Sequence, residues 1–230
     1  MHFFWQKAKI SIEEHGFFYV LIAITSIFFL WPLIHKSNTM HLFLGGIFFL
    51  IIFASARTLG KANVFAFFIS FLFILIQESI YLLQALYPNL QTIFSHVLVG
   101  TVILYSLGLE LVILKHILRS SRINVNDVYG AVCLYVLFAL TWGVIYFFIA
   151  TIDHKAFSIA PDPIKPFITA PRYIYSSFFI LAGIYGDVHP ISFTARLFTL
   201  VEVVIGQLFP LVLISWLVSH LRDLHSHPHT

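Results

Sequence analysis

The chain has 230 residues, of which 60% are hydrophobic and only 10% are charged, with 13 Lys and Arg against 10 Asp and Glu. So few charged residues cannot cover the apolar side chains of a soluble fold of this length. The composition therefore excludes a soluble nucleic-acid-binding domain, a disordered chain and a secreted disulfide scaffold, and it predicts an all-α integral membrane protein.

Six apolar segments reach or approach the length of a transmembrane helix, which needs about 20 residues. They span residues 16–34, 39–56, 62–86, 90–114, 128–152 and 197–221. Three of them contain no Asp, Glu, Lys or Arg, and the other three contain one acid each: Glu78, Glu110 and Glu202. We therefore predict six transmembrane helices.

A long insertion, residues 153–196, separates the fifth and sixth segments. It begins with a proline-rich stretch and continues with an apolar run at 173–182, which is too short to cross a hydrocarbon core of about 30 Å. In a membrane protein such a run indicates a re-entrant or interfacial helix.

The basic residues predict the orientation of the chain, because Lys and Arg are enriched on the cytoplasmic side of a membrane. With the N-terminus inside, eight of the 13 basic residues are cytoplasmic, and four lie in the insertion, which then faces outside. Both termini are predicted to be cytoplasmic. The fourth segment has no row of Arg residues at every third position, so the first four helices do not form a usual voltage sensor.

The apolar run in the insertion ends in a sequence suited to a cation pathway. Its residues are Ala182, Gly183, Ile184, Tyr185, Gly186 and Asp187. A short helix that points into the bilayer carries partial negative charge at its C-terminus, and backbone carbonyls on the return can replace the hydration shell of a cation. The alternative is that Tyr185-Gly186-Asp187 forms an ordinary external turn.

Further motifs flank this sequence. Pro190 follows Asp187 by three residues. The preceding helix reads Asp127-Val128-Tyr129-Gly130-Ala131-Val132-Cys133-Leu134-Tyr135 with Trp142 and Tyr146, and the following helix reads Ala195-Arg196-Leu197 and Glu202-Val203-Val204-Ile205-Gly206-Gln207-Leu208. Residues 120–221 thereby resemble the potassium-channel superfamily, and more closely the small bacterial ion-channel proteins with a two-helix pore domain.

The resemblance implies six transmembrane helices, with a re-entrant pore helix and a filter loop between helices five and six. It divides the chain into a four-helix N-terminal region (1–119), a pore domain (120–222) and a short His-rich cytoplasmic tail (223–230). It implies a homotetramer in the inner (plasma) membrane that conducts monovalent cations passively, with potassium the first candidate. Such a protein is not an enzyme, needs no cofactor, and has membrane lipids but no nucleic acid as partners.

The filter sequence departs from the family pattern, which is Thr-Val-Gly-Tyr-Gly-Asp or a close variant. The aligned residues here run from Ala182 to Asp187, so the threonine hydroxyl is absent and Ile184 occupies the position of the first glycine. Such a filter uses residues with φ > 0, which a β-branched residue strongly disfavours. Either Ile184 disrupts the filter or Gly183 takes the glycine role. We expect weak potassium preference, non-selective conduction or no conduction.

Four residues of the last helix are candidates for filter support and gating: Glu202, Gly206, Gln207 and Pro210. Glu202 matches the acid of the family motif, and we expect it to brace the filter through hydrogen bonds to the pore helix. Gly206 and Pro210 predict a hinge or bend, with close helix packing at Gly206 as the alternative. For Glu78 and Glu110 we expect interfacial or helix–helix contacts.

Further predictions concern the single cysteine and four of the histidines. Cys133, the single cysteine, is expected to be a small core residue. The tail residues His225, His227 and His229 are weak candidates for metal binding, although a solvated tail is the favoured interpretation and no metal site is predicted. His189, beside the outer mouth, is a candidate for sensing external pH. Two other functions remain open: a non-conducting channel homologue that acts in assembly or signalling, and a membrane redox or haem protein.

Overall fold

The structure is a computed structural model that describes residues 17, 18, 20–22, 24, 25, 63–119, 125–159 and 170–226. Most of the described residues are helical, and three helices are long and apolar enough to cross a membrane: Pro88–Arg119, Val125–Ile152 and Phe193–Leu213. A helix satisfies its own backbone hydrogen bonds, which is required in hydrocarbon. The predicted membrane-protein class and three of the predicted segments therefore agree with the structure.

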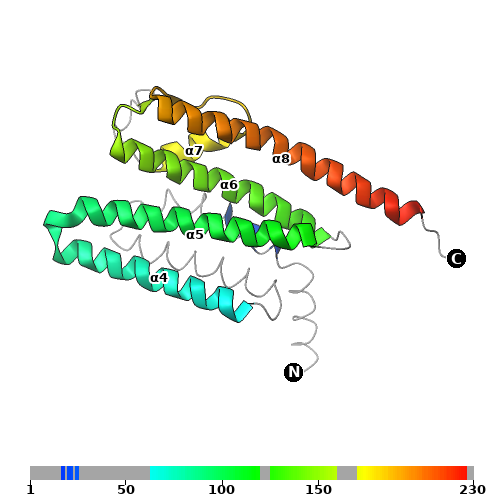
Figure 1. Ribbon diagram of the computed structural model, residues 1–230, viewed down its shortest axis with the longest axis horizontal. Coiled ribbons are helices and arrows are strands. Elements are labelled where there is room, and N and C mark those ends of the chain that lie inside the picture. The colour runs from blue at the N-terminus through cyan, green and yellow to red at the C-terminus, as the bar shows by residue number, and fades with distance from the viewer. Residues whose placement is uncertain are drawn as a thin grey trace. The chain divides into compact units, whose positions relative to one another are not determined.

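The described elements follow one another in a simple order (Figure 1). They are the helices α4 (Asn63–Leu86), η2 (Pro88–Leu90), α5 (Gln91–Arg119) and α6 (Val125–Ile152), the strand β1 (Phe157–Ile159), the helix α7 (Ala170–Leu181), the strand β2 (Val188–Pro190) and the helix α8 (Phe193–Ser226). The third predicted segment corresponds to α4, whereas most of 16–34 and all of 39–56 lie outside the described residues.

The contacts group the chain into two compact units. One contains Met1–Phe94 and Leu111–Leu134, and the other contains Ser95–Glu110 and Tyr135–Thr230. The division runs across α5 and α6, so each of these helices contributes to both units. The predicted division of the chain at residue 119 stays a prediction.

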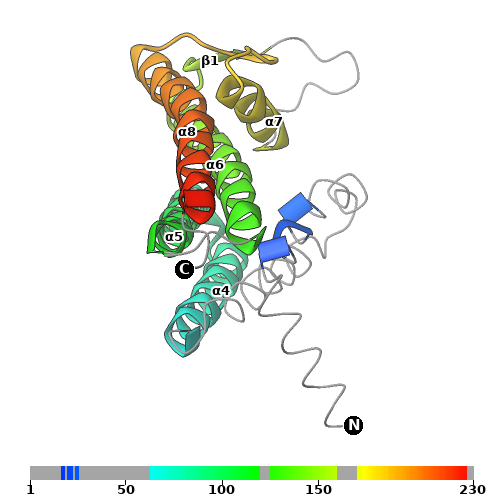
Figure 2. The ribbon, with the colours of Figure 1, turned by 90° about the vertical axis from the view of Figure 1, so that its right-hand side faces the viewer.

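The second unit contains the insertion, which holds a short helix and a short two-stranded ribbon. Strand β1 pairs antiparallel with β2, with Phe157 opposite Pro190 and Ile159 opposite Val188. This pairing joins the beginning of the insertion to its end. Figure 2 shows α7 beside α6 and α8, with the ribbon near the start of α8.

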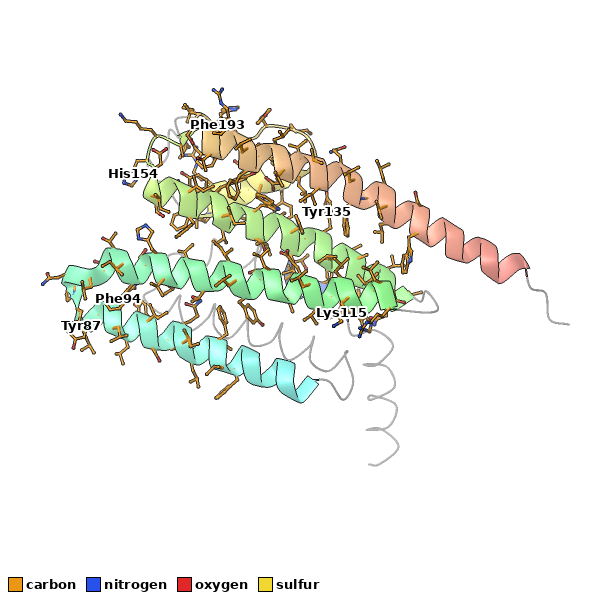
Figure 3. The ribbon with its side chains drawn as sticks, in the orientation of Figure 1. Tyr87, Phe94, Lys115, Tyr135, His154 and Phe193 are labelled. Atoms are coloured by element: carbon orange, nitrogen blue, oxygen red, sulfur yellow. The ribbon has the colours of Figure 1, made fainter. Side chains whose placement is uncertain are left out.

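Aromatic and aliphatic side chains form the core beneath the ribbon. Tyr146 of α6 meets Phe157 of β1 with ring centroids 5.4 Å apart, and Phe157 meets Tyr173 of α7 at 5.6 Å. Both pairs have the edge-to-face geometry that aromatic rings prefer. The buried members of this core are Tyr146, Ala150, Ala156, Phe157, Tyr173, Ile180, Val188 and Ala195. Further along the helices, Tyr135 of α6, which is labelled in Figure 3, stacks on Phe209 of α8.

Helix α7 has 12 residues, corresponding to a length of about 18 Å at about 1.5 Å per residue. It is too short to cross the membrane, as the apolar run at 173–182 predicted. Pro171 occupies its first turn, where a missing N–H costs nothing. At its other end the Gly183 N–H donates to the Ile180 carbonyl and the Ile184 N–H donates to the Phe179 carbonyl. With Gly183 at φ 81°, this is a Schellman cap.

Candidate functional site

The backbone of α7 is held against both neighbouring helices at two glycines. A Cβ on Gly143 of α6 would lie 2.4 Å from the Cα of Ile174, and a Cβ on Gly206 of α8 would lie 2.3 Å from the carbonyl oxygen of Leu181. Real Cβ atoms do not approach other atoms so closely. The three helices therefore pack at a distance that only glycine permits at these positions.

This contact favours one of the two interpretations of Gly206. The residue is buried at the end of α7, and α8 continues as a helix through Gly206 and Pro210. In the structure Gly206 allows close packing against α7, and the helix is not interrupted at this residue. Proline has no N–H, so Pro210 cannot donate the helical hydrogen bond to the Gly206 carbonyl four residues earlier.

Glu202 connects the same three helices through its side chain. The side chain of Glu202 is fully buried, and its two carboxyl oxygens contact the hydroxyls of Tyr146 on α6 and Ser177 on α7. The Ser177 hydroxyl also lies 2.8 Å from the Ala139 carbonyl oxygen of α6. The structure thus contains the hydrogen bond between Glu202 and the short helix that we expected, whereas a role of Glu202 in filter support stays a prediction.

The residues that follow α7, Ala182–Asp187, form an exposed loop, named here the 182–187 loop. Ile184 and Tyr185 are 58% and 60% exposed, although both side chains are large and apolar in character. Gly183 is the glycine with positive φ, and no other described residue has a positive φ. Gly183 rather than Ile184 therefore adopts the left-handed conformation, and Ile184 is accommodated without backbone strain.

The far end of the 182–187 loop packs on α7. A Cβ on Gly186 would lie 3.2 Å from the Oγ of Ser176, which is buried and has no hydrogen-bond partner among the described residues. Asp187 and His189 lie beyond this contact, and the ring of His189 lies 6.0 Å from that of Tyr185. Asp187 and His189, the two residues of the predicted outer mouth, therefore lie at the same end of the loop.

Gln207 of α8 lies at the other end of the loop. Its amide nitrogen would be 3.2 Å from a Cβ on Gly183, which places the carboxamide beside the cap of α7. The residue is exposed, in contrast to its neighbour Gly206. The structure thus groups Gly183, Gly206, Gln207 and the end of α7.

Glu110 forms a second buried polar contact in this unit. Its side chain is 5% exposed and accepts a hydrogen bond of 2.5 Å from the hydroxyl of Thr141 on α6. This is a helix–helix contact, one of the two environments that we expected for Glu110. Glu78 lies partly buried on α4.

The first unit contains a separate cluster around Phe17. The Phe17 N–H donates to Asn126 Oδ1 at 2.9 Å, and the thiol of Cys133 donates to the Phe17 carbonyl at 3.2 Å. His116 packs its ring against Phe17 and lies 3.8 Å from the buried carboxylate of Asp127. Cys133 is buried, so its prediction as a core residue is confirmed.

Within the described part of the chain, no group of three or more His, Cys, Asp or Glu side chains is arranged to hold a metal. His227 and His229 lie outside the described residues, and His225 lies in the last turn of α8, where side chains are not described.

The sequence did not predict Ser177 as the partner of Glu202 or Thr141 as the partner of Glu110. Ser177 was detectable, since it follows Ser176 within an otherwise apolar run.

Among the described residues, three helices are long and apolar enough to cross a membrane, and the short helix α7 is held between two of them, which fits a helical membrane protein. Neither family models, nor curated proteins, nor solved structures provide a match to this chain.

Proposed function

We propose that the chain is one subunit of a homotetrameric cation channel in the inner (plasma) membrane, with six transmembrane helices, cytoplasmic termini and the 182–187 loop as its filter. Monovalent cations cross passively, with potassium the first candidate, and no cofactor or chemical step is involved. The proposal combines the sequence resemblance to potassium channels with the local geometry of α6, α7 and α8.

The observation that carries the proposal is the fixation of α7. This helix is too short to span, yet Gly143 and Gly206 hold it against two helices of membrane-spanning length, and Glu202 binds its Ser177. An exposed loop follows its C-terminus, where the helix carries partial negative charge. This arrangement supports a cation pathway because non-helical backbone within a membrane must line a wet cavity or be buried in protein.

The exposure of the 182–187 loop supports assembly into a tetramer. Ile184 and Tyr185 would be poorly placed in water as adjacent, largely exposed apolar side chains, and copies of the same chain around an axis would cover them. One chain supplies one loop, whereas a ring of carbonyl ligands needs several. Closed symmetry with identical chains is the usual solution for soluble oligomers, and the same geometry suits a pore.

The backbone of the loop supports weak rather than strong selectivity. Strong discrimination between potassium and sodium needs several consecutive carbonyl rings. Gly183 is the single residue of the loop with positive φ, and its N–H closes the cap of α7. Successive carbonyls are therefore not all turned toward one side in this chain. The same observation favours a second candidate, a non-conducting homologue that acts in assembly or signalling.

Ion flux through the purified protein in lipid vesicles tests the proposal. We expect cation flux above that of protein-free vesicles, a mass in detergent that corresponds to four chains, and a bi-ionic reversal potential that indicates weak potassium preference. A tetramer without flux would favour the non-conducting homologue. A stable monomer that conducts would refute the tetrameric pore.

The orientation is tested at Ser158, which is exposed on β1. In a background with Cys133→Ala, we expect Ser158→Cys to react with an impermeant thiol reagent applied outside. Reaction from the cytoplasmic side alone would invert the proposed topology.

A further inference from the structure

Gln207 is a polar residue on an exposed apolar stripe of α8. The stripe follows the helical spacing of four, three and four residues, and consists of Leu200, Val204, Gln207 and Leu211. Its three aliphatic members are 60%, 47% and 62% exposed. An unpaired carboxamide in hydrocarbon is costly, so a stripe that faced lipid would be expected to be apolar throughout.

The position of Gln207 relative to α7 indicates what its carboxamide meets. A Cβ on Gly206 would meet the Leu181 carbonyl, so the adjacent Gln207 lies beside the C-terminus of α7, and its amide nitrogen would lie 3.2 Å from a Cβ on Gly183. The C-terminus of a helix carries partial negative charge, which favours a cation over an anion. The amide oxygen and nitrogen of Gln207 exchange by rotation of the group, so either can face the site.

A second oxygen is available next to Gln207. Because Pro210 lies inside α8 and has no N–H, the Gly206 carbonyl lacks its helical donor. A carbonyl freed in this way inside a membrane needs another partner, such as water or an ion. Consecutive residues of α8 beside the end of α7, Gly206 and Gln207, can therefore each supply one neutral oxygen.

The charges of the surrounding groups indicate which kind of cation the site would bind. Glu202 is the nearest acid along α8, and it is fully buried and bound to Tyr146 and Ser177. Asp187 lies at the opposite end of the loop sequence. Calcium and magnesium sites use carboxylates, whereas neutral carbonyl and amide oxygens suit a weakly held monovalent cation.

We infer that Gln207 and the Gly206 carbonyl form a binding site for a partly hydrated monovalent cation where α7 meets the 182–187 loop. This inference rests on the proposed channel function, and it assigns to α8 the polar ligands that the absent threonine hydroxyl would have supplied. Gln207 faces a water-filled cavity and not lipid.

The first test measures access of water to position 207. In a Cys133→Ala background, Gln207→Cys is compared with Leu104→Cys, an exposed residue of α5. Both proteins, reconstituted in vesicles, are treated on both sides with a permanently charged thiol reagent and weighed by mass spectrometry. We expect modification at position 207 and none at position 104. A Gln207→Cys protein that resists the charged reagent, while a lipid-soluble reagent still modifies it, would overturn the inference.

The second test measures cation flux in Gln207→Leu and Gln207→Glu. Leucine removes the side-chain oxygen, and we expect flux to fall by about tenfold, which corresponds to about 1.4 kcal/mol on a rate barrier. Glutamate keeps an oxygen at the same reach, and flux should be retained. Equal flux in the wild type and Gln207→Leu would overturn the cation site alone. Absence of flux in the wild type would refute the proposed function and, with it, the cation site.

Discussion

Replacement of Gly206 by alanine tests the packing that holds α7. The added Cβ would lie 2.3 Å from the Leu181 carbonyl oxygen and 2.9 Å from Leu181 Cδ1. The first of these atoms belongs to the backbone, so α7 or α8 has to move. Overpacking of this kind lowers the free energy of unfolding by about 1–3 kcal/mol.

The matched control is Gly108→Ala on α5, where no atom lies within 4 Å of the added Cβ. Both substitutions gain the same helix propensity, about 1 kcal/mol in favour of alanine, so their difference reports packing alone. Gly143→Ala, whose Cβ would lie 2.4 Å from the Ile174 Cα, is expected to behave like Gly206→Ala.

Thermal unfolding in detergent measures the difference. A relative loss of about 2 kcal/mol lowers Tm by about 4–8 °C in a chain of this size. We also expect cation flux to be lost or reduced in Gly206→Ala, because the end of α7 is displaced. A Gly206→Ala protein as stable as Gly108→Ala, with unchanged flux, would show that α7 is not held by this contact.

Three further predictions concern buried polar groups and the cap of α7. Glu202→Gln should keep near wild-type stability, because an amide can both donate and accept at this position, whereas Glu202→Leu should lower the melting temperature by leaving buried hydroxyls unpaired. Thr141→Val should lower the free energy of unfolding by about 1–3 kcal/mol, because Glu110 loses its hydrogen-bond donor, and Thr141→Ser should keep most of that stability. Equal melting temperatures for the two variants would contradict the contact. Gly183→Ala should lower the free energy of unfolding by about 1–2 kcal/mol, because φ is 81° at this position, and circular-dichroism melting of this variant against the wild type checks it.

Much of the fold around α7 was predictable because it depends on local properties of the sequence. The apolar run at 173–182 predicted a short helix, and the structure has α7 at Ala170–Leu181, which begins earlier than the run. The difference follows from Pro171, which belongs to the proline-rich stretch by composition but is compatible with the first turn of a helix. Apolar length also predicted α5, α6 and α8 correctly.

The site was less predictable because its contacts join distant parts of the chain. The sequence allowed two roles for Gly183, and the choice depends on hydrogen bonds to Phe179 and Ile180 that close the helix. Similarly, the pattern around Gly206 did not distinguish a hinge from a packing contact, because the Leu181 backbone that it meets is 25 residues away in the sequence. Nothing in the composition near Glu110 indicated Thr141 as its partner.

The pairing of β1 with β2 also affects how the insertion tolerates changes in length. The ribbon pairs Ile159 with Val188, and Gly143 packs against α7, so the described residues before 160 and after 169 each have contacts of their own. Lengthening a connection between two fixed ends costs little, about 0.6 kcal/mol in closure entropy for each doubling of its length. An epitope comparable in length to 160–169, inserted within that segment, should therefore leave the fold intact, and antibody binding to intact cells would then report directly on which side of the membrane the insertion lies.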